Sequence, residues 1–341
     1  SPPAAAITSP APAAAQNAAF NVSGSASDAF GVSFASVTFQ EADTLMYYDV
    51  GSSTFSSVSP YWLATTLSGT APNYTWSAAA PAIAGTSGRQ YNLYVKVTNS
   101  AGTSYTSSAV FITYDTTKPV SSVSFPVDQS FLNFISSVTG AASDSGAPAS
   151  GVGGAQIQIQ REDTLCWNAS AWVGGCAASW LSAVAGSPWT KNTQLPAFVD
   201  GSSYAVRSRA FDVAGNTQTV TTANTFRYDV SSPTASIQLP TNGAYYGSLP
   251  ILSGTAQDNT PGFNVDFPQV RIHDIGLNQY WNGVGWVAPP NTWNVALGSS
   301  STGGVFTWSY NSSGVTWPNR DQGLRVDVTV HSDEMTFDFS R

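Results

Sequence analysis

The feature that most constrains this sequence is an internal repeat. Three segments open on a proline, at Pro2, Pro119 and Pro233. About 25 residues after each opening comes a near-copy of one hexapeptide, which reads SGSASD from Ser23, TGAASD from Thr139 and SGTAQD from Ser253. Openings and hexapeptides both recur about every 115 residues, so the copies stay in phase. The period predicts three tandem units, which we place at 1–117, 118–231 and 232–341.

Each unit shows the pattern of β-strands joined by tight turns. An alternating stretch comes after the hexapeptide, at Val37–Gln40, Ile157–Gln160 and Val270–His273. Alternation puts the apolar side chains on one face of a strand and the polar ones on the other. An aromatic hairpin comes next in every copy, and turn signals recur about every ten residues with no helical period between them. We therefore predict an all-β chain of three β-sandwiches.

The last strand of each unit is expected at Phe111–Tyr114, Phe226–Tyr228 and Phe337–Phe339. A long strand and a turn precede it in the first two units, where the turns contain Gly102 and Gly215. The third unit has no glycine at this turn. Its last turn is therefore predicted to diverge.

Composition excludes several classes of protein. The 341 residues include 9% charged residues and only 12 Lys and Arg, for a net charge of −8. A nucleic-acid binder needs a basic surface, and so does a protein that attaches to anionic membranes, so both are excluded. No run of 18 apolar residues spans a bilayer, and the first residues do not resemble a signal peptide.

Cys166 and Cys176 are the only cysteines. Two interpretations are open, a disulfide or two reduced and buried thiols. The Ser/Thr-rich, Lys-poor composition favours an oxidising, extracellular location and therefore the disulfide.

The turn Asp212–Asn216 and the linkers Tyr114–Pro119 and Tyr228–Pro233 carry a family resemblance. They resemble the bacterial immunoglobulin-like repeats of large surface proteins and adhesins, and the Tyr-x-Val strands also resemble fibronectin type III domains. The resemblance implies tandem immunoglobulin-like sandwiches in an extended array at the cell surface. Some members of the family bind calcium near domain junctions. Because the chain begins and ends in phase with its repeat, we expect a segment of a longer array.

Aspartates recur at turns and linkers, where calcium is the ion that they suit best. Ca²⁺ prefers six to eight oxygen ligands. The candidate ligands are Asp28, Asp115, Asp144, Asp212, Asp229 and Asp258, with Asn216 beside Asp212. The alternative is that these side chains only cap turns through backbone hydrogen bonds. The pattern requires no cofactor.

The aromatic hairpin of the third unit has two interpretations. Tyr280, Trp281 and Trp286 surround an Asn-Gly turn and could stack on a glycan. Recurrence of aromatic residues at this place in all three units favours core packing instead.

No nucleophile, zinc or phosphate-binding motif is visible, so we predict no catalytic residue and no enzyme. The leading hypothesis is a structural and adhesive stalk or filament segment that contacts neighbouring repeats and self-assembles into fibres. The alternative is a module that binds a surface glycan or a protein receptor. Both are extracellular, and neither inserts into a membrane.

Overall fold

The three-dimensional structure is a computed structural model. It describes residues 1–81, 87–146, 148–184, 186–220, 222–257, 265–290, 292–300, 305–318, 323–332 and 335–339. Within these residues the strands form six sheets around three hydrophobic cores. We call each core with its two sheets a sandwich.

The strands of the first sandwich are β1 (Ala4–Ser9), β2 (Ala14–Gln16), β3 (Asn21–Ser27), β4 (Val32–Glu41), β5 (Tyr47–Asp49), β6 (Thr54–Ser57), β7 (Leu63–Ala64), β8 (Thr66–Thr70), β9 (Asn73–Ala79), β10 (Arg89–Asn99), β11 (Ser104–Thr106) and β12 (Val110–Tyr114). One sheet has the order β1-β3-β9-β8, and the other has the order β2-β12-β10-β4-β5-β6.

The second sandwich contains β13 (Val120–Phe125), β14 (Ser130–Leu132), β15 (Val138–Ser143), β16 (Val152–Arg161), β17 (Cys166–Trp167), β18 (Trp172–Val173), the 3-10 turn η1 (Cys176–Ala178), β19 (Leu181–Ser182), β20 (Trp189–Lys191), β21 (Ser203–Asp212) and β22 (Asn224–Tyr228). Its larger sheet repeats the order of the first, β14-β22-β21-β16-β17-β18.

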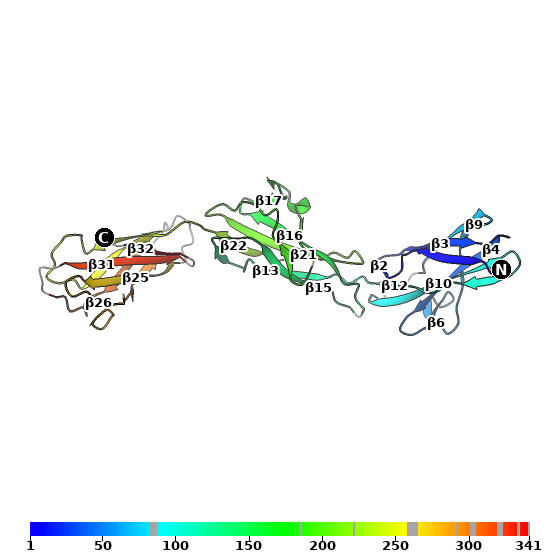
Figure 1. The fold of residues 1–341 in the computed structure, drawn as a ribbon, viewed down its shortest axis with the longest axis horizontal. Helices are drawn as coiled ribbons and strands as arrows, with labels where there is room; N and C mark the ends of the chain where they lie inside the picture. Colours follow the sequence, from blue (N-terminus) through cyan, green and yellow to red (C-terminus); the bar gives the residue numbers. More distant parts are fainter. Residues whose placement is uncertain are drawn as a thin grey trace.

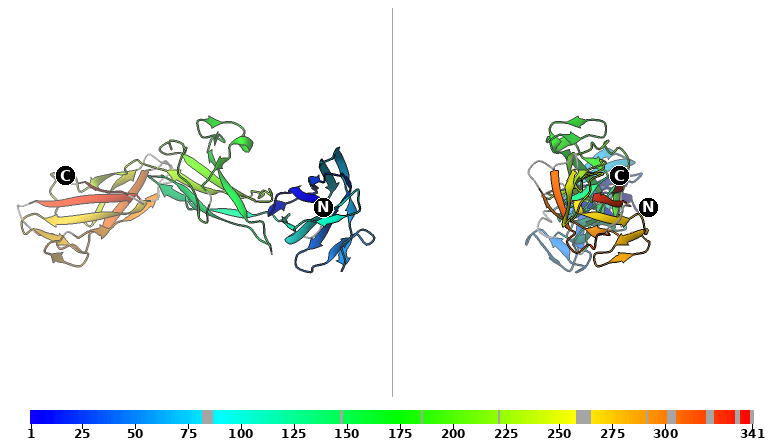
Figure 2. Two further views of the ribbon diagram at one scale, coloured as in Figure 1. Left: turned by 45° about the vertical axis from the view of Figure 1, so that its right-hand side comes forward. Right: turned by 90° about the vertical axis from the view of Figure 1, so that its left-hand side faces the viewer.

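The third sandwich contains β23 (Thr234–Leu239), β24 (Ile251–Gln257), β25 (Val265–Asp274), β26 (Gln279–Trp281), β27 (Trp286–Val287), β28 (Asn294–Val295), β29 (Leu297–Ser300), β30 (Val305–Asn311), β31 (Leu324–Ser332) and β32 (Met335–Phe339). The all-β prediction is confirmed. Figure 1 shows the three sandwiches following one another along the long axis of the molecule, and Figure 2 shows the same extended arrangement from two other sides.

The hexapeptide found in the sequence forms the floor under a buried tryptophan. Trp76, Trp189 and Trp308 each lie in the core and donate their indole N–H to a backbone carbonyl of the hexapeptide strand. A Cβ atom on the glycine of each hexapeptide would collide with the indole ring and with a carbonyl of the neighbouring strand, at Gly24, Gly140 and Gly254. The repeated Gly therefore exists to admit the repeated Trp.

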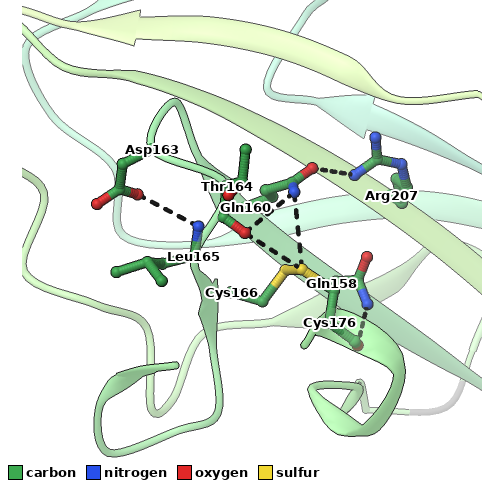
Figure 3. Close-up of a disulfide and its surroundings, with 8 residues drawn as sticks. All are labelled: Gln158, Gln160, Asp163, Thr164, Leu165, Cys166, Cys176 and Arg207. Carbon is green, nitrogen blue, oxygen red and sulfur yellow. Dashed lines mark hydrogen bonds between the residues drawn. A yellow bond between two sulfur atoms is a disulfide. The ribbon is translucent and has the colours of Figure 1, made fainter. Parts of the chain in front are cut away.

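The predicted disulfide is present in the second sandwich, where it joins β17 to η1 (Figure 3). Cys166 is fully buried. Gln158, on the neighbouring β16, donates its amide to the Cys176 carbonyl at 2.6 Å. The crosslink thus holds an irregular loop against a core strand.

The prediction for the last strand of the third unit is wrong. β32 pairs with Val328–Ser332 of β31. In the first sandwich the matching part of β10 pairs with β11, while β12 lies further along, against Arg89–Leu93. An alternating strand can occupy either position on one sheet edge, so its sequence alone did not fix the register. β32 therefore corresponds to β11 and not to β12.

Among the described residues, no helical segment has the length and hydrophobicity of a membrane span.

Candidate functional site at the first junction

Three carboxylates meet where the first sandwich ends and the second begins. Asp115 comes directly after β12, Asp144 comes directly after β15, and Asp212 ends β21. One oxygen of each lies within 4.8 Å of the others. Asp115 and Asp212 are buried, and Asp144 is half-buried. Linker and second sandwich thus place up to three negative charges in one small, poorly hydrated space.

Asp115 links the two sandwiches directly. Its Oδ1 accepts the Thr117 N–H at 2.9 Å and the Ser87 hydroxyl at 3.2 Å, on the side of the first sandwich. Its Oδ2 accepts the Ser150 N–H of the second sandwich at 2.8 Å. Burial would raise the pKa of Asp115, but these donors outweigh burial and hold the pKa below its ordinary value.

Asp144 is in the opposite situation. Burial raises the pKa of its carboxyl, the Gly151 N–H lowers it, and the nearby charges of Asp115 and Asp212 raise it further, so that the pKa lies above its ordinary value. Its Oδ2 accepts the Gly151 N–H at 2.9 Å. Its Oδ1 is buried and has no hydrogen-bond partner. An ionised Asp144 therefore needs a positive partner that would neutralise the cluster.

Two asparagines complete the junction. Asn216 donates its side-chain amide to the backbone carbonyl of Asp115 at 2.8 Å and to Asp212 Oδ2 at 2.7 Å. Asn17, which comes directly after β2 of the first sandwich, donates to Asn216 Oδ1 at 3.3 Å. The first sandwich, the linker and the second sandwich are therefore joined by one continuous set of hydrogen bonds.

The donor set fits a calcium ion better than a transition metal. Only oxygen ligands converge, without a histidine or cysteine, and hard cations such as Ca²⁺ prefer them. The unpartnered Asp144 Oδ1 is the oxygen that such a cation would satisfy first. Backbone carbonyls and water would supply the remaining ligands.

The other predicted calcium ligands do not join this cluster. Asp28 lies at the far end of the first sandwich, where it accepts the Phe30 N–H at 2.8 Å and the Asn99 amide at 3.2 Å. These donors lower the pKa of Asp28. Asp229 lies in the second linker and accepts the Ser231 N–H at 3.0 Å. Asp258 lies outside the described residues.

The aromatic hairpin of the third sandwich forms no exposed platform of three rings. Trp281 is only 4% exposed and packs edge-on against Trp286 at 5.8 Å between ring centroids. The indole N–H of Trp286 donates to the Thr316 carbonyl. Tyr280 is half-buried and stacks on His273 at 4.3 Å. Because Trp281 faces the core, it cannot also stack on a glycan.

Sequence reasoning missed Ser87, Ser150 and Asn17, three of the residues that hold the junction together. Each lies in a loop or just beyond a short strand, far along the chain from the carboxylates. Polar loop residues of this kind are abundant in this sequence, so no local signal distinguishes these three.

Comparisons with known proteins place the chain among tandem β-modules. No protein-family model matches it, and no curated protein does. Solved structures that match include fibronectin(III)-like modules of Clostridium thermocellum CbhA, at 17% identity and a TM-score of 0.33, covering 66% of this chain and 94% of that one.

Two adhesion proteins match along nearly the whole chain. A structure from a 1.5-MDa bacterial ice-binding adhesin is 16% identical with a TM-score of 0.36, covering 99% of this chain and 96% of that one. A tetra-tandem repeat from the extending region of a large adhesion protein is 15% identical with a TM-score of 0.28, covering 99% and 73%. The structural neighbours are thus fibronectin III-like modules and adhesin repeats.

Proposed function

We propose that this chain is a stalk segment of a large extracellular adhesive protein, divided into three domains near residues 117 and 231. The observation that carries the proposal is the first junction, where side chains from both sandwiches and the linker are joined by hydrogen bonds. Such a junction resists bending, which a spacer needs and a flexible tether does not. The intramolecular disulfide supports an extracellular location.

We further propose that Ca²⁺ bound by Asp115, Asp144 and Asp212 stiffens this junction. The ion would neutralise three charges contributed from both sides of the boundary between the domains. Its removal would leave mutual repulsion, which favours separation of the linker from the second domain.

Small-angle X-ray scattering tests both statements. In calcium, the chain should scatter as a rod longer than about 100 Å, the span expected of three sandwiches in line. A chelator should increase the flexibility at the junction without unfolding any sandwich, and Asp144→Asn should abolish the response to calcium. Asp28→Asn is the matched control, because Asp28 holds the same repeat position without neighbouring carboxylates. A compact particle would exclude the stalk, and equal scattering in calcium and chelator would exclude the ion.

A further inference from the structure

The outer edge of β31 is only half covered. β32 pairs with Val328–Ser332, and along Leu324–Asp327 no strand of the described chain pairs on that side. The other side of β31 pairs with β25 over the same residues. Backbone N–H and C=O groups along Leu324–Asp327 therefore form an open sheet edge, the kind of surface that accepts another strand.

The same edge is filled in the first two sandwiches. Cross-strand register shows that Val326, which faces Ile272, is equivalent to Leu93 and Val206, which face Phe39 and Ile159. On its other side Leu93 pairs with β12, and Val206 pairs with β22.

Burial of the equivalent side chains follows this difference. Leu93 and Val206 are fully buried, whereas Val326 is only half-buried. Leu324 is also half-buried, although its equivalents Tyr91 and Tyr204 are buried. The apolar face of the third sandwich is thus built for a strand that the described residues do not contain.

A second segment of the third sandwich is also left without its partner. In the first two sandwiches a residue with positive φ, Ala13 or Gln129, leads into a short strand that pairs in parallel with the edge strand, β2 with β12 and β14 with β22. Gly243 has the same positive φ. Ala244–Tyr246, which comes directly after it, forms no strand, and Tyr245 is fully exposed. The strand that would pair with it is the one that Leu324–Asp327 also lacks.

We propose that the third sandwich is a strand acceptor. Its slot lies between Leu324–Asp327 and Ala244–Tyr246, and its occupant is an extended segment of a separate polypeptide with the sequence pattern of β12 and β22. These two strands fill the equivalent slots, and each ends in Tyr followed by Asp. The guest strand runs antiparallel to β31 and parallel to Ala244–Tyr246, as β12 and β22 do in their own sheets. Main-chain hydrogen bonds supply affinity, and alternate apolar side chains supply specificity.

The probe is a fluorescent peptide with the sequence of Ala109–Thr116, titrated with the full chain and followed by anisotropy. We expect saturable binding of one peptide per chain, about tenfold tighter than for a scrambled peptide of the same composition. Absence of binding would overturn the proposal. Equal binding of the scrambled peptide would overturn it as well, because mere apolar adhesion does not read the strand pattern.

Two exposed apolar residues provide matched variants. Tyr245→Ser should weaken peptide binding by about fivefold through the loss of a cross-strand contact. Leu297→Ser, on a strand of the opposite sheet, should leave binding unchanged. Hydrogen exchange should show that the bound peptide protects Ala244–Tyr246 and Leu324–Asp327. Protection elsewhere, or equal losses in the two variants, would refute the slot. None of these outcomes depends on calcium, so failure here leaves the stalk proposal standing.

Discussion

Asp115 and Asp229 occupy the same position in the first and second linkers. Each donates its N–H to the short parallel strand of the preceding sandwich, Asp115 to Gln16 and Asp229 to Leu132. Each also accepts the N–H two residues further on. The turn that leads out of a sandwich is therefore built once and used twice, and it does not depend on the sandwich that comes next.

The two junctions differ in how the linker is held. At the first, Ser87 binds the linker and leaves Asp115 Oδ2 to reach the next sandwich. At the second, the equivalent residue is Asp200, whose two oxygens accept the Val230 N–H and the Ser231 hydroxyl. One carboxylate thus reaches forward across a boundary, while the other ties the linker back to the sandwich that it leaves.

Acidic residues differ between the junctions as well. Register places Ser332 at the position of Asp212, because both end the strand that pairs with β25 or β16. The second junction thus has one carboxylate fewer than the first. Since affinity for Ca²⁺ rises with the number of charged ligands, the comparison predicts one strong site per chain, at the first junction.

The largest effect is expected from making the first junction resemble the second. Asp212→Ser should lower calcium affinity by about 100-fold, because it removes one of three charged ligands. Isothermal titration calorimetry measures this directly, with circular dichroism to show that the sandwich remains folded. Unchanged affinity would mean that the three carboxylates are not the site. The reciprocal change, Ser332→Asp, should add a second and weaker binding event.

The disulfide tests whether the second sandwich itself, which flanks both junctions, decides how stiff they are. Replacing Cys166 and Cys176 together by Ala should lower the free energy of unfolding of this sandwich by roughly 2.5–3 kcal/mol, the loop-closure contribution. Calcium binding at the first junction, measured by calorimetry, should persist, since the crosslink lies on the loop between β17 and η1. Loss of calcium binding in the folded variant would contradict a site made by the carboxylates alone.

Separate linker contacts should give a smaller and selective effect. Asp200→Ala removes acceptors for Val230 and Ser231 and should loosen only the second junction, by about 1 kcal/mol. Ser87→Ala should do the same only at the first. Hydrogen exchange of the linker amides distinguishes the two cases, and equal loosening of both linkers by either variant would show that the junctions are coupled.

Acid should produce the smallest change, visible only without calcium. The pKa of Asp144 lies above its ordinary value of 3.8, so its ionisation opposes folding, and this penalty disappears as pH falls through its folded-state pKa. Asp115 has a lowered pKa and keeps its charge until lower pH. The second sandwich in chelator should therefore become slightly more stable as the pH is lowered toward about 4. Thermal unfolding of Asp144→Asn should lack this gain, and a gain of equal size in the variant would assign it to another group.

Several elements of the fold were predictable because they depend on local pattern. The hexapeptide glycines, the buried tryptophans and the aromatic hairpins recur at fixed spacing, and each contact joins parts of one repeat. A constant period within one chain identifies such contacts without any structure. The cysteine pair was predicted on the same local basis.

The site was predictable only in part. Six aspartates fitted one pattern, yet the structure brings together only Asp115, Asp144 and Asp212. Their meeting depends on the path of the linker and on loops held by Ser150 and Asn216, which lie far apart in the sequence.

The sequence by itself determined the all-β class, the repeat and the residues that fill each core, because alternation and turn chemistry act over a few residues. Only the tertiary structure decided which carboxylates converge, that Trp281 faces inward, and that β32 lies at the position of β11. These outcomes depend on strand register and on contacts between distant segments. An alternating strand satisfies either register equally well in sequence, and only the edge that remains open in three dimensions selects one.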